Sequence, residues 1–382
     1  MSKHAHAAAR LPIDGMERST AEGRTFSAHS PATGEVLWEV PDAGPEDARA
    51  AVHAARNACY GTTWGTDEAL RASVLGEVQG VLAAEADHLA EVLAVTAGVP
   101  VALRAEHVDG PIAALSAVVP GARGTDPAGV TAVITPATSP LAVALADLGR
   151  VLASGGTVVL KPAPEAASAA LELARILMPV VPRGVLNVLT TRDVDVAIGL
   201  TRDPGVDAVS FTGSSFVGER VREAAGSAGK DVRVTVGGAR VVRAGNDAML
   251  AAVVADAARA VGGNAGQACH VPASIVVPVD RHAEAVELAV AAMEGVAVGD
   301  PTDPGTLCGP LRSRVALDRV RRYVALARSE GADVPLGGDP LDRDGWWFPP
   351  TVVAGLGEQS RVVLEELLGP VVMVVPASWG RA

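Results

Sequence analysis

The chain has 382 residues, 49% of them hydrophobic and only 3% aromatic, and its formal net charge at pH 7 is −12. That length favours two domains over a single hydrophobic core. The acidic balance, with no run of Lys or Arg, argues against binding to nucleic acid or a membrane surface, and no apolar run reaches membrane-spanning length.

Residues 1–11 are expected to be a disordered lead-in, and the first regular elements that we predict are helices. After Pro45, small apolar residues recur at helical spacing as far as Cys59, which predicts a helix with Cys59 in the core. A longer helical region is predicted from residue 67 to about residue 96, where a glycine and a proline follow.

From residue 129 the pattern changes to short β-rich runs that alternate with helical runs. We predict strands at 130–134, 157–160, 185–189, 208–211 and 232–236 and helices at 141–152, 166–177, 194–200 and 217–225. This alternation is typical of an α/β fold with a doubly wound parallel sheet, here assigned to a dinucleotide-binding domain over 12–242. Such sheets bind ligands at the carboxyl ends of their strands.

A second α/β domain is expected over 243–382. A predicted helix near 247–261 leads into a glycine-rich segment that ends at Cys269. A strand at 274–277, helices at 283–293 and 315–328 and further strands follow.

Two segments of the first domain have the residues that a dinucleotide site needs. Phe211-Thr212-Gly213-Ser214, with Gly218 five positions after Gly213, joins a strand to a helix, where glycine lets a phosphate approach the backbone. Many strand–helix turns look the same, so this motif alone leaves both interpretations open. Lys161 ends another strand, where a lysine can bind ribose hydroxyls or a phosphate, or simply lie in solvent.

The chain has three cysteines, Cys59, Cys269 and Cys308, which is too few for a disulfide framework and indicates a reducing compartment. The N-terminus lacks the apolar core of a signal peptide, so a cytoplasmic protein is expected. Cys308 is interpreted as a core residue. Cys269 could attack a carbonyl carbon as its thiolate, although by itself a small buried residue is the simpler interpretation.

Together these segments resemble the aldehyde dehydrogenase superfamily, from about Ser30 to the end of the chain. The matching segments occur in the family's order and at nearly its spacing: Pro31-Ala32-Thr33-Gly34-Glu35, Ile134-Thr135-Pro136, Leu160-Lys161-Pro162, Phe211-Thr212-Gly213-Ser214, Gly266-Gln267-Ala268-Cys269, Gly299-Asp300-Pro301, Gly309-Pro310-Leu311 and Glu365-Glu366-Leu367-Leu368-Gly369-Pro370. Each segment is short, but the set is specific for the fold.

The resemblance implies roles for individual residues. Cys269 would be the nucleophile that adds to an aldehyde, after which hydride passes to NAD or NADP and a thioester remains. Lys161 would contact a ribose, Ser214 and Val217 would flank the pyrophosphate and adenine, and Glu366 would hold the nicotinamide ribose. The remaining residues assigned to cofactor binding are Ile134, Thr135, Pro136, Phe211, Gly213, Gly218 and Leu368. No metal site is expected.

Two catalytic positions depart from the family pattern. Thr138 stands where the family has the asparagine that donates to the oxyanion, and losing one such donor typically costs about 10²–10³ in rate. Thr235 stands where the family has the glutamate that serves as general base, a loss of roughly 10²–10⁴. His270 is a candidate replacement base, although adjacent side chains usually point apart. Fast oxidation of an aldehyde to an acid is therefore not expected.

The cofactor loop also departs from the family. Thr191-Arg192-Asp193 replaces a glycine-containing approach to the pyrophosphate, and Pro164 stands where NAD-preferring members often have a glutamate. We therefore expect weak dinucleotide affinity, and the sequence does not decide between NAD and NADP.

Two segments of the family are missing. Residues 100–134 are too few for its protruding β-hairpin, and the chain stops at Ala382, before the strand that pairs with that hairpin. The catalytic domain is thus expected to be C-terminally truncated, and the protein to be a monomer or weak dimer instead of a tetramer.

Three functions remain open on the sequence. The first is a thiol-dependent enzyme that acts on a small-molecule aldehyde or acyl thioester with degraded oxidative machinery, redeployed in specialised metabolism. The second is a CoA-acylating type, because such relatives lack the glutamate. The third is a non-redox enzyme or a binding scaffold. Only three lysines stand beside 29 arginines, which with the Ala, Gly and Val content suggests a bacterial source.

Overall fold

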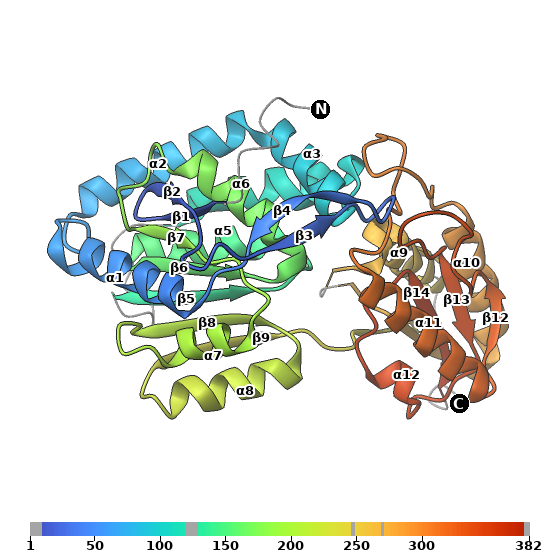
Figure 1. Ribbon diagram of the computed structural model, residues 1–382. Coiled ribbons are helices and arrows are strands. Elements are labelled where there is room, and N and C mark those ends of the chain that lie inside the picture. Colours follow the sequence, from blue (N-terminus) through green and yellow to red (C-terminus); the bar gives the residue numbers. More distant parts are fainter. Residues whose placement is uncertain (1–9, 119–128, 246–248, 269–270, 378–382) are drawn as a thin grey trace. The chain divides into compact units, whose positions relative to one another are not determined.

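The computed structural model describes residues 10–118, 129–245, 249–268 and 271–377 (Figure 1). The chain divides into two compact units. Unit 1 comprises residues 1–29, 36–92 and 104–236, and unit 2 comprises residues 30–35, 93–103 and 237–382. Within these described ranges, no helix combines the length and apolar character that crossing a membrane requires.

Unit 1 is built on a five-stranded parallel sheet with the order β7-β6-β5-β8-β9. The strands are β5 (Val130–Thr135), β6 (Thr157–Pro162), β7 (Leu186–Val188), β8 (Ala208–Gly213) and β9 (Asp231–Val236). The four helices between them are α5 (Pro140–Ala153), α6 (Ala167–Leu177), α7 (Val194–Arg202) and α8 (Ser215–Gly226). The predicted doubly wound parallel sheet is therefore confirmed.

Successive side chains of each strand point to opposite faces of this sheet, and a different set of helices covers each face. On one face, Val130, Ala132 and Ile134 of β5 pack in a single core with helix α1 (Pro45–Gly61), α7 and α8. On the other face, α5 packs against β5 and β6, and α6 against β6 and β7. Every residue of β5 is buried, as expected for a strand that is covered on both faces.

The N-terminal strands were missed by the sequence analysis. Strands β1 (Leu11–Ile13) and β2 (Met16–Arg18) form one antiparallel hairpin, and β3 (Thr25–His29) and β4 (Val36–Pro41) form another. The first strand begins at Leu11, which is fully buried and is the last residue of the expected lead-in. The Asp14-Gly15 turn, with both residues at positive φ, is a hairpin signal that could have located this pair.

The helical region predicted from residue 67 to about residue 96 is two helices. They are α2 (Glu68–Ala84) and α3 (Ala86–Ala97), and Glu85 between them leaves the helical conformation at φ −99°, ψ 11°. The apolar spacing continues across this break, so periodicity could not reveal it. The sequence analysis also missed four short helical segments that follow α3 and one that follows β6. These are η1 (Val101–Leu103), η2 (Ala105–Asp109), α4 (Gly110–Ala114), η3 (Leu115–Ala117) and η4 (Pro164–Ala166).

Unit 2 is built on a second five-stranded sheet, with the order β10-β11-β14-β13-β12. Its strands are β10 (Val241–Arg243), β11 (Ser274–Pro278), β12 (Asp333–Leu336), β13 (Thr351–Ala354) and β14 (Val371–Ala377), and only β12 runs antiparallel to its neighbour. The helical segments are α9 (Leu250–Gly262), η5 (Gly263–Gly266), η6 (Val279–Arg281), α10 (His282–Glu294), α11 (Arg314–Ser329) and α12 (Arg361–Leu364). The strands and helices predicted for this part of the chain are present.

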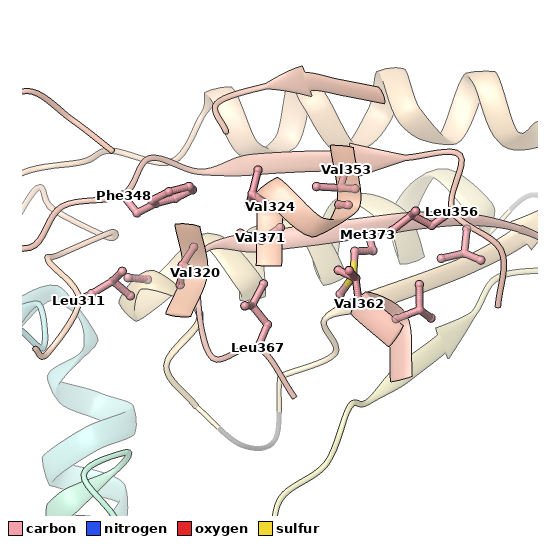
Figure 2. Packing of buried hydrophobic residues seen from close by; sticks show 14 of the residues in the cluster. Leu311, Val320, Val324, Phe348, Val353, Leu356, Val362, Leu367, Val371 and Met373 are labelled. Atoms are coloured by element: carbon pink, nitrogen blue, oxygen red, sulfur yellow. The ribbon is translucent and has the colours of Figure 1, made fainter. Parts of the chain in front are cut away.

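Strand β14 shows how unit 2 is packed. Val372 and Val374 face a core shared with α9 and α10, whereas Val371, Met373 and Val375 face a core shared with α11 and α12. Figure 2 shows this second core, where Phe348 lies among the aliphatic side chains. Phe348 is only 1% exposed in this core, and Tyr323 and Trp346 pack against it while only partly buried.

We predict that Phe348→Ala lowers the free energy of unfolding of unit 2 by about 3–5 kcal/mol, because Phe348 is only 1% exposed and its loss leaves a cavity. Val315→Ala, on α11 but 73% exposed, is the control and should change it by less than about 0.5 kcal/mol. Urea unfolding measures both, and equal effects would contradict the packing described for this core.

Candidate functional site

A pocket of about 620 Å³ lies at the carboxyl ends of β5, β6 and β8. It contains eight of the residues that the sequence assigned to cofactor binding: Ile134, Thr135, Pro136, Lys161, Phe211, Gly213, Ser214 and Val217. These residues come from three separate stretches of sequence. They meet because parallel strands deliver their carboxyl ends to one edge of the sheet.

The far wall of this pocket is apolar and comes from α7 and α8. Val194, Ala197 and Ile198 of α7 and Val217 and Val221 of α8 line it. Val194 is 63% exposed and Val217 is 43% exposed, so apolar surface faces solvent here. Solvent-exposed apolar surface between two helices suits a flat ring such as a purine, whose faces are apolar and whose edges are polar.

The turn into α8 combines two glycines and a helix N-terminus. A Cβ at Gly213 would lie 2.5 Å from Cζ of Phe211, so a side chain there would displace that ring. The Oγ of Ser214 accepts a hydrogen bond from the backbone N–H of Val217 at 3.4 Å and caps the helix. Gly218 does not line the pocket, because its missing side chain makes room for Val234 on β9.

Lys161 is half-buried at the end of β6, and its ammonium forms no hydrogen bond or ion pair with any described residue. Burial lowers the pKa of Lys161 below its ordinary value, and the nearby Glu165 carboxylate opposes that shift. A cation that lacks a protein partner at the edge of a pocket is suited to a polar or anionic ligand group.

The loop that was expected to crowd a pyrophosphate is tied to other protein groups. The backbone N–H of Arg192 donates to Asp42 Oδ1 at 3.0 Å, and its guanidinium lies over the ring of Phe26. The carboxylate of Asp193 caps α7 by accepting from the N–H groups of Asp195 and Val196. Both side chains line the pocket, but each is anchored on one side by these contacts.

Thr138 and Thr235 lie apart from the lining of this pocket. Thr138 is 7% exposed in the turn between β5 and α5, followed by Ser139 in a left-handed conformation at φ 52°. Thr235 is exposed on the edge strand β9, in register with Thr212 of β8.

Unit 2 has a small cavity of its own around the segment that carries Cys269. Gly266, Ala268 and Val271 line it together with Glu366 and Leu368, the two cofactor residues assigned in this unit. Cys269 and His270 lie outside the described residues.

The carboxyl group of Glu366 is packed over a glycine. A Cβ at Gly237 would overlap the carboxylate of Glu366, so a side chain there would displace that carboxylate. Burial raises the pKa of Glu366, while Arg319 and Arg312 act in the opposite direction. This acidic side chain is thus half-buried beside the segment that leads to the thiol.

The chain is tightly constrained immediately before Cys269. Asn264 and Ala265 are both left-handed, at φ 46° and 50°, which non-glycine residues adopt only under strong local constraint. Gln267 constrains the backbone here through three hydrogen bonds. Its Nε2 donates to the carbonyls of Asn264 and Pro310 at 3.2 Å, and its Oε1 accepts from the backbone N–H of Arg312 at 2.9 Å. The sequence analysis gave Gln267 no role, although a long polar side chain in a segment of small residues was a signal.

The other two thiols are core residues, as predicted. Cys308 is fully buried, and burial raises its pKa to about 12. Cys59 is 5% exposed, and burial raises its pKa too. Among the residues that the structure describes, no group of three or more His, Cys, Asp or Glu side chains could hold a metal ion.

Comparison with known proteins connects these features to one family. A model described as "Aldehyde dehydrogenase family" matches residues 18–379. A hydroxyisobutyraldehyde dehydrogenase of Mycolicibacterium austroafricanum is 30% identical over 95% of this chain and 76% of its own length. An indole-3-acetaldehyde dehydrogenase mutant of P. syringae, solved with NAD⁺ and IAA, is 28% identical with a TM-score of 0.92, over 98% of this chain and 81% of its own. An NAD⁺ complex of a Bacillus cereus aldehyde dehydrogenase is 27% identical, with the same TM-score and coverage.

We predict that Lys161→Met raises the free energy of unfolding at pH 7, because methionine removes a half-buried ammonium that has no partner among the described residues. The folded-state pKa of Lys161 lies below its unfolded value, so the unfolded chain binds that proton more tightly. Wild-type stability should therefore rise between those two pKa values, and the advantage of the variant should shrink as pH approaches about 10.4.

Urea unfolding at pH 7, 8.5 and 10 measures this difference. Lys230→Met is the matched control, since its ammonium donates to the carbonyls of Asp203 and Val206 at 2.8 and 2.6 Å. The Lys230→Met substitution should lower the free energy of unfolding by about 1–3 kcal/mol. A similar loss for Lys161→Met at pH 7 would show that its ammonium is already satisfied.

Proposed function

The chain belongs to the aldehyde dehydrogenase family, and from that premise we propose that it oxidises an aldehyde through the thiol of Cys269 with a nicotinamide dinucleotide as hydride acceptor. The observation that carries the proposal is the pocket in unit 1, where eight residues selected from sequence meet at the edge of the parallel sheet. Relatives that are named as aldehyde dehydrogenases support the substrate class.

The pocket fits the adenosine half of such a cofactor. Val194 and Val217 offer apolar surface to a base. Lys161 offers a ribose or phosphate a cation that has no hydrogen-bond partner among the described residues, and the N-terminus of α8 offers N–H groups to an anion. Glu366 in unit 2 is the candidate for holding the other ribose. When bound, the nicotinamide would supply the hydride acceptor.

The proposed chemistry of the chain begins with the Cys269 thiolate. Its sulfur would form a bond to the aldehyde carbon, and the carbonyl π-electrons would move to oxygen to give the oxyanion of a hemithioacetal. A bound dinucleotide would supply the hydride acceptor for that carbon, and re-formation of the C=O bond would leave a thioester on Cys269. Attack by water then breaks the C–S bond and releases an acid and the thiol.

The threonines at positions 138 and 235 would slow two specific steps of this chemistry. Without the asparagine donor that Thr138 replaces, the oxyanion formed on addition loses stabilisation. A threonine at position 235 cannot take a proton from water near neutral pH, so thioester hydrolysis lacks its usual base. We therefore propose that acyl release is slow compared with acyl formation.

Coenzyme A is a second candidate acceptor for the acyl group. A thiolate attacks a thioester without the general base that water requires, and Thr235 is the observation that favours this route. Acyl-CoA formed when CoA is added would identify it, whereas release of free acid at an unchanged rate would exclude it.

We predict that iodoacetamide modifies Cys269 before Cys59 or Cys308. The last two are 5% and 0% exposed, and burial raises the pKa of each thiol, so little thiolate is present at pH 8. Peptide mass mapping over time measures all three, with Cys269→Ala as the control. If Cys269 reacts no faster than Cys308, the nucleophile assignment is wrong.

Restoring the family residues should increase turnover. The double variant Thr138→Asn, Thr235→Glu should raise steady-state aldehyde oxidation by at least about 10²-fold, because it returns an oxyanion donor and a general base. The single variants are the controls, and their effects need not multiply. An unchanged rate in a folded double variant that still binds dinucleotide would contradict the proposal that these two positions limit oxidation.

A further inference from the structure

The pocket in unit 1 is rich in positive charge, although the chain is strongly acidic. Six ionisable residues line it, the basic Lys161, Arg192, Arg202 and Arg220 and the acidic Asp193 and Glu223. The lining thus has a formal charge of +2, whereas the chain as a whole has −12. Local charge of this sign concentrates ligands that carry several phosphate groups.

The acidic residues are not placed to accept hydrogen bonds from a ribose at the end of β6. The carboxylate of Asp193 already accepts from two N–H groups of α7. Glu223 is exposed on α8, and Glu165 does not line the pocket. Directly after β6, Ala163 and Pro164 form the lining and offer no carboxylate.

The basic residues, in contrast, have donors to spare. The ammonium of Lys161 has no hydrogen-bond partner among the described residues. The guanidinium of Arg192 lies 3.7 Å from Asp42 Oδ2 and over the ring of Phe26, and its side chain is still 59% exposed, so the side chain remains accessible to a ligand. An ammonium and a guanidinium with free donors are the protein groups best suited to a phosphate.

We infer that this pocket binds NADP in preference to NAD, with Lys161 and Arg192 contacting the phosphate on the adenosine ribose. The inference rests on the proposed function, because it takes the pocket to be the cofactor site. In dinucleotide-binding sheets, a carboxylate that accepts from the 2′-hydroxyl favours NAD, and a nearby Arg accommodates the 2′-phosphate of NADP. The lining residues of this pocket include the Arg, whereas Glu165, the carboxylate that acts on Lys161, is not one of them.

Isothermal titration calorimetry on the full chain tests this by comparing NADP with NAD, and 2′,5′-ADP with 5′-AMP. The two smaller nucleotides probe this pocket without the nicotinamide half. NADP and 2′,5′-ADP should each bind roughly tenfold or more tightly than their partners, as charge-assisted contacts to a phosphate imply. The ratio of the affinities for NADP and NAD should fall as the salt concentration increases, because salt screens the contacts to the phosphate.

Two variants test which residues determine the preference for NADP over NAD. Arg192→Gln should weaken NADP binding about tenfold and leave NAD binding nearly unchanged, and Pro164→Glu should act in the same direction by adding a carboxylate. The matched control is Arg222→Gln, because Arg222 is on α8, one of the helices beside the pocket, but pairs with Glu219 and does not line the pocket. That control should leave the NADP-to-NAD ratio of affinities unchanged.

The outcomes separate the inference from the proposed function. If both dinucleotides bind and NAD binds equally well or better, the inference is overturned and the proposed function stands. If Arg192→Gln weakens both dinucleotides equally, Arg192 does not read the 2′-phosphate. If no adenine nucleotide binds, the proposed function and the inference both fail.

Discussion

The parallel register of β5 with its two neighbours is the constraint on which the first unit depends. Ile134 is aligned with Lys161 of β6 on one side and with Phe211 of β8 on the other. A shift of one residue in either strand would turn Lys161 or Phe211 to the opposite face of the sheet. The pocket therefore follows from the sheet, and the sheet follows from five short β-rich runs separated by helices.

The sequence was sufficient for this sheet because its signals are local and repeated. Each strand is a short β-rich run, and each helix has an apolar face, so the order of elements was predictable. The break at Glu85 was not, because the apolar spacing passes through it unchanged. The hairpin of β1 and β2 was missed because each strand has three residues, although Asp14-Gly15 marked its turn.

The candidate site was predictable in part for the same reason. Residues at strand ends, such as Lys161 and Gly213, could be selected because their place in the sheet was known. The position of Gln267 could not, since its role depends on a hydrogen bond to Arg312, 45 residues further along the chain. In the same way, the anchoring of Arg192 by Asp42 is a contact across 150 residues, and no spacing rule gives it.

The two units supply different parts of one proposed chemistry. Unit 1 offers a cationic pocket for a phosphorylated nucleotide, and unit 2 holds the segment before Cys269 in a left-handed turn fixed by a buried glutamine. In that proposed chemistry, the threonine at position 235 would leave the acyl group on sulfur without the usual base for hydrolysis. The central claim is therefore that a thioester on Cys269 forms and persists.

Intact-mass spectrometry after mixing the protein with NADP and an aliphatic aldehyde tests this claim most directly. The account predicts one acyl group per chain, absent in Cys269→Ala, with one equivalent of reduced cofactor in the first turnover. An unmodified mass at every time point, whether or not aldehyde is consumed, would contradict it.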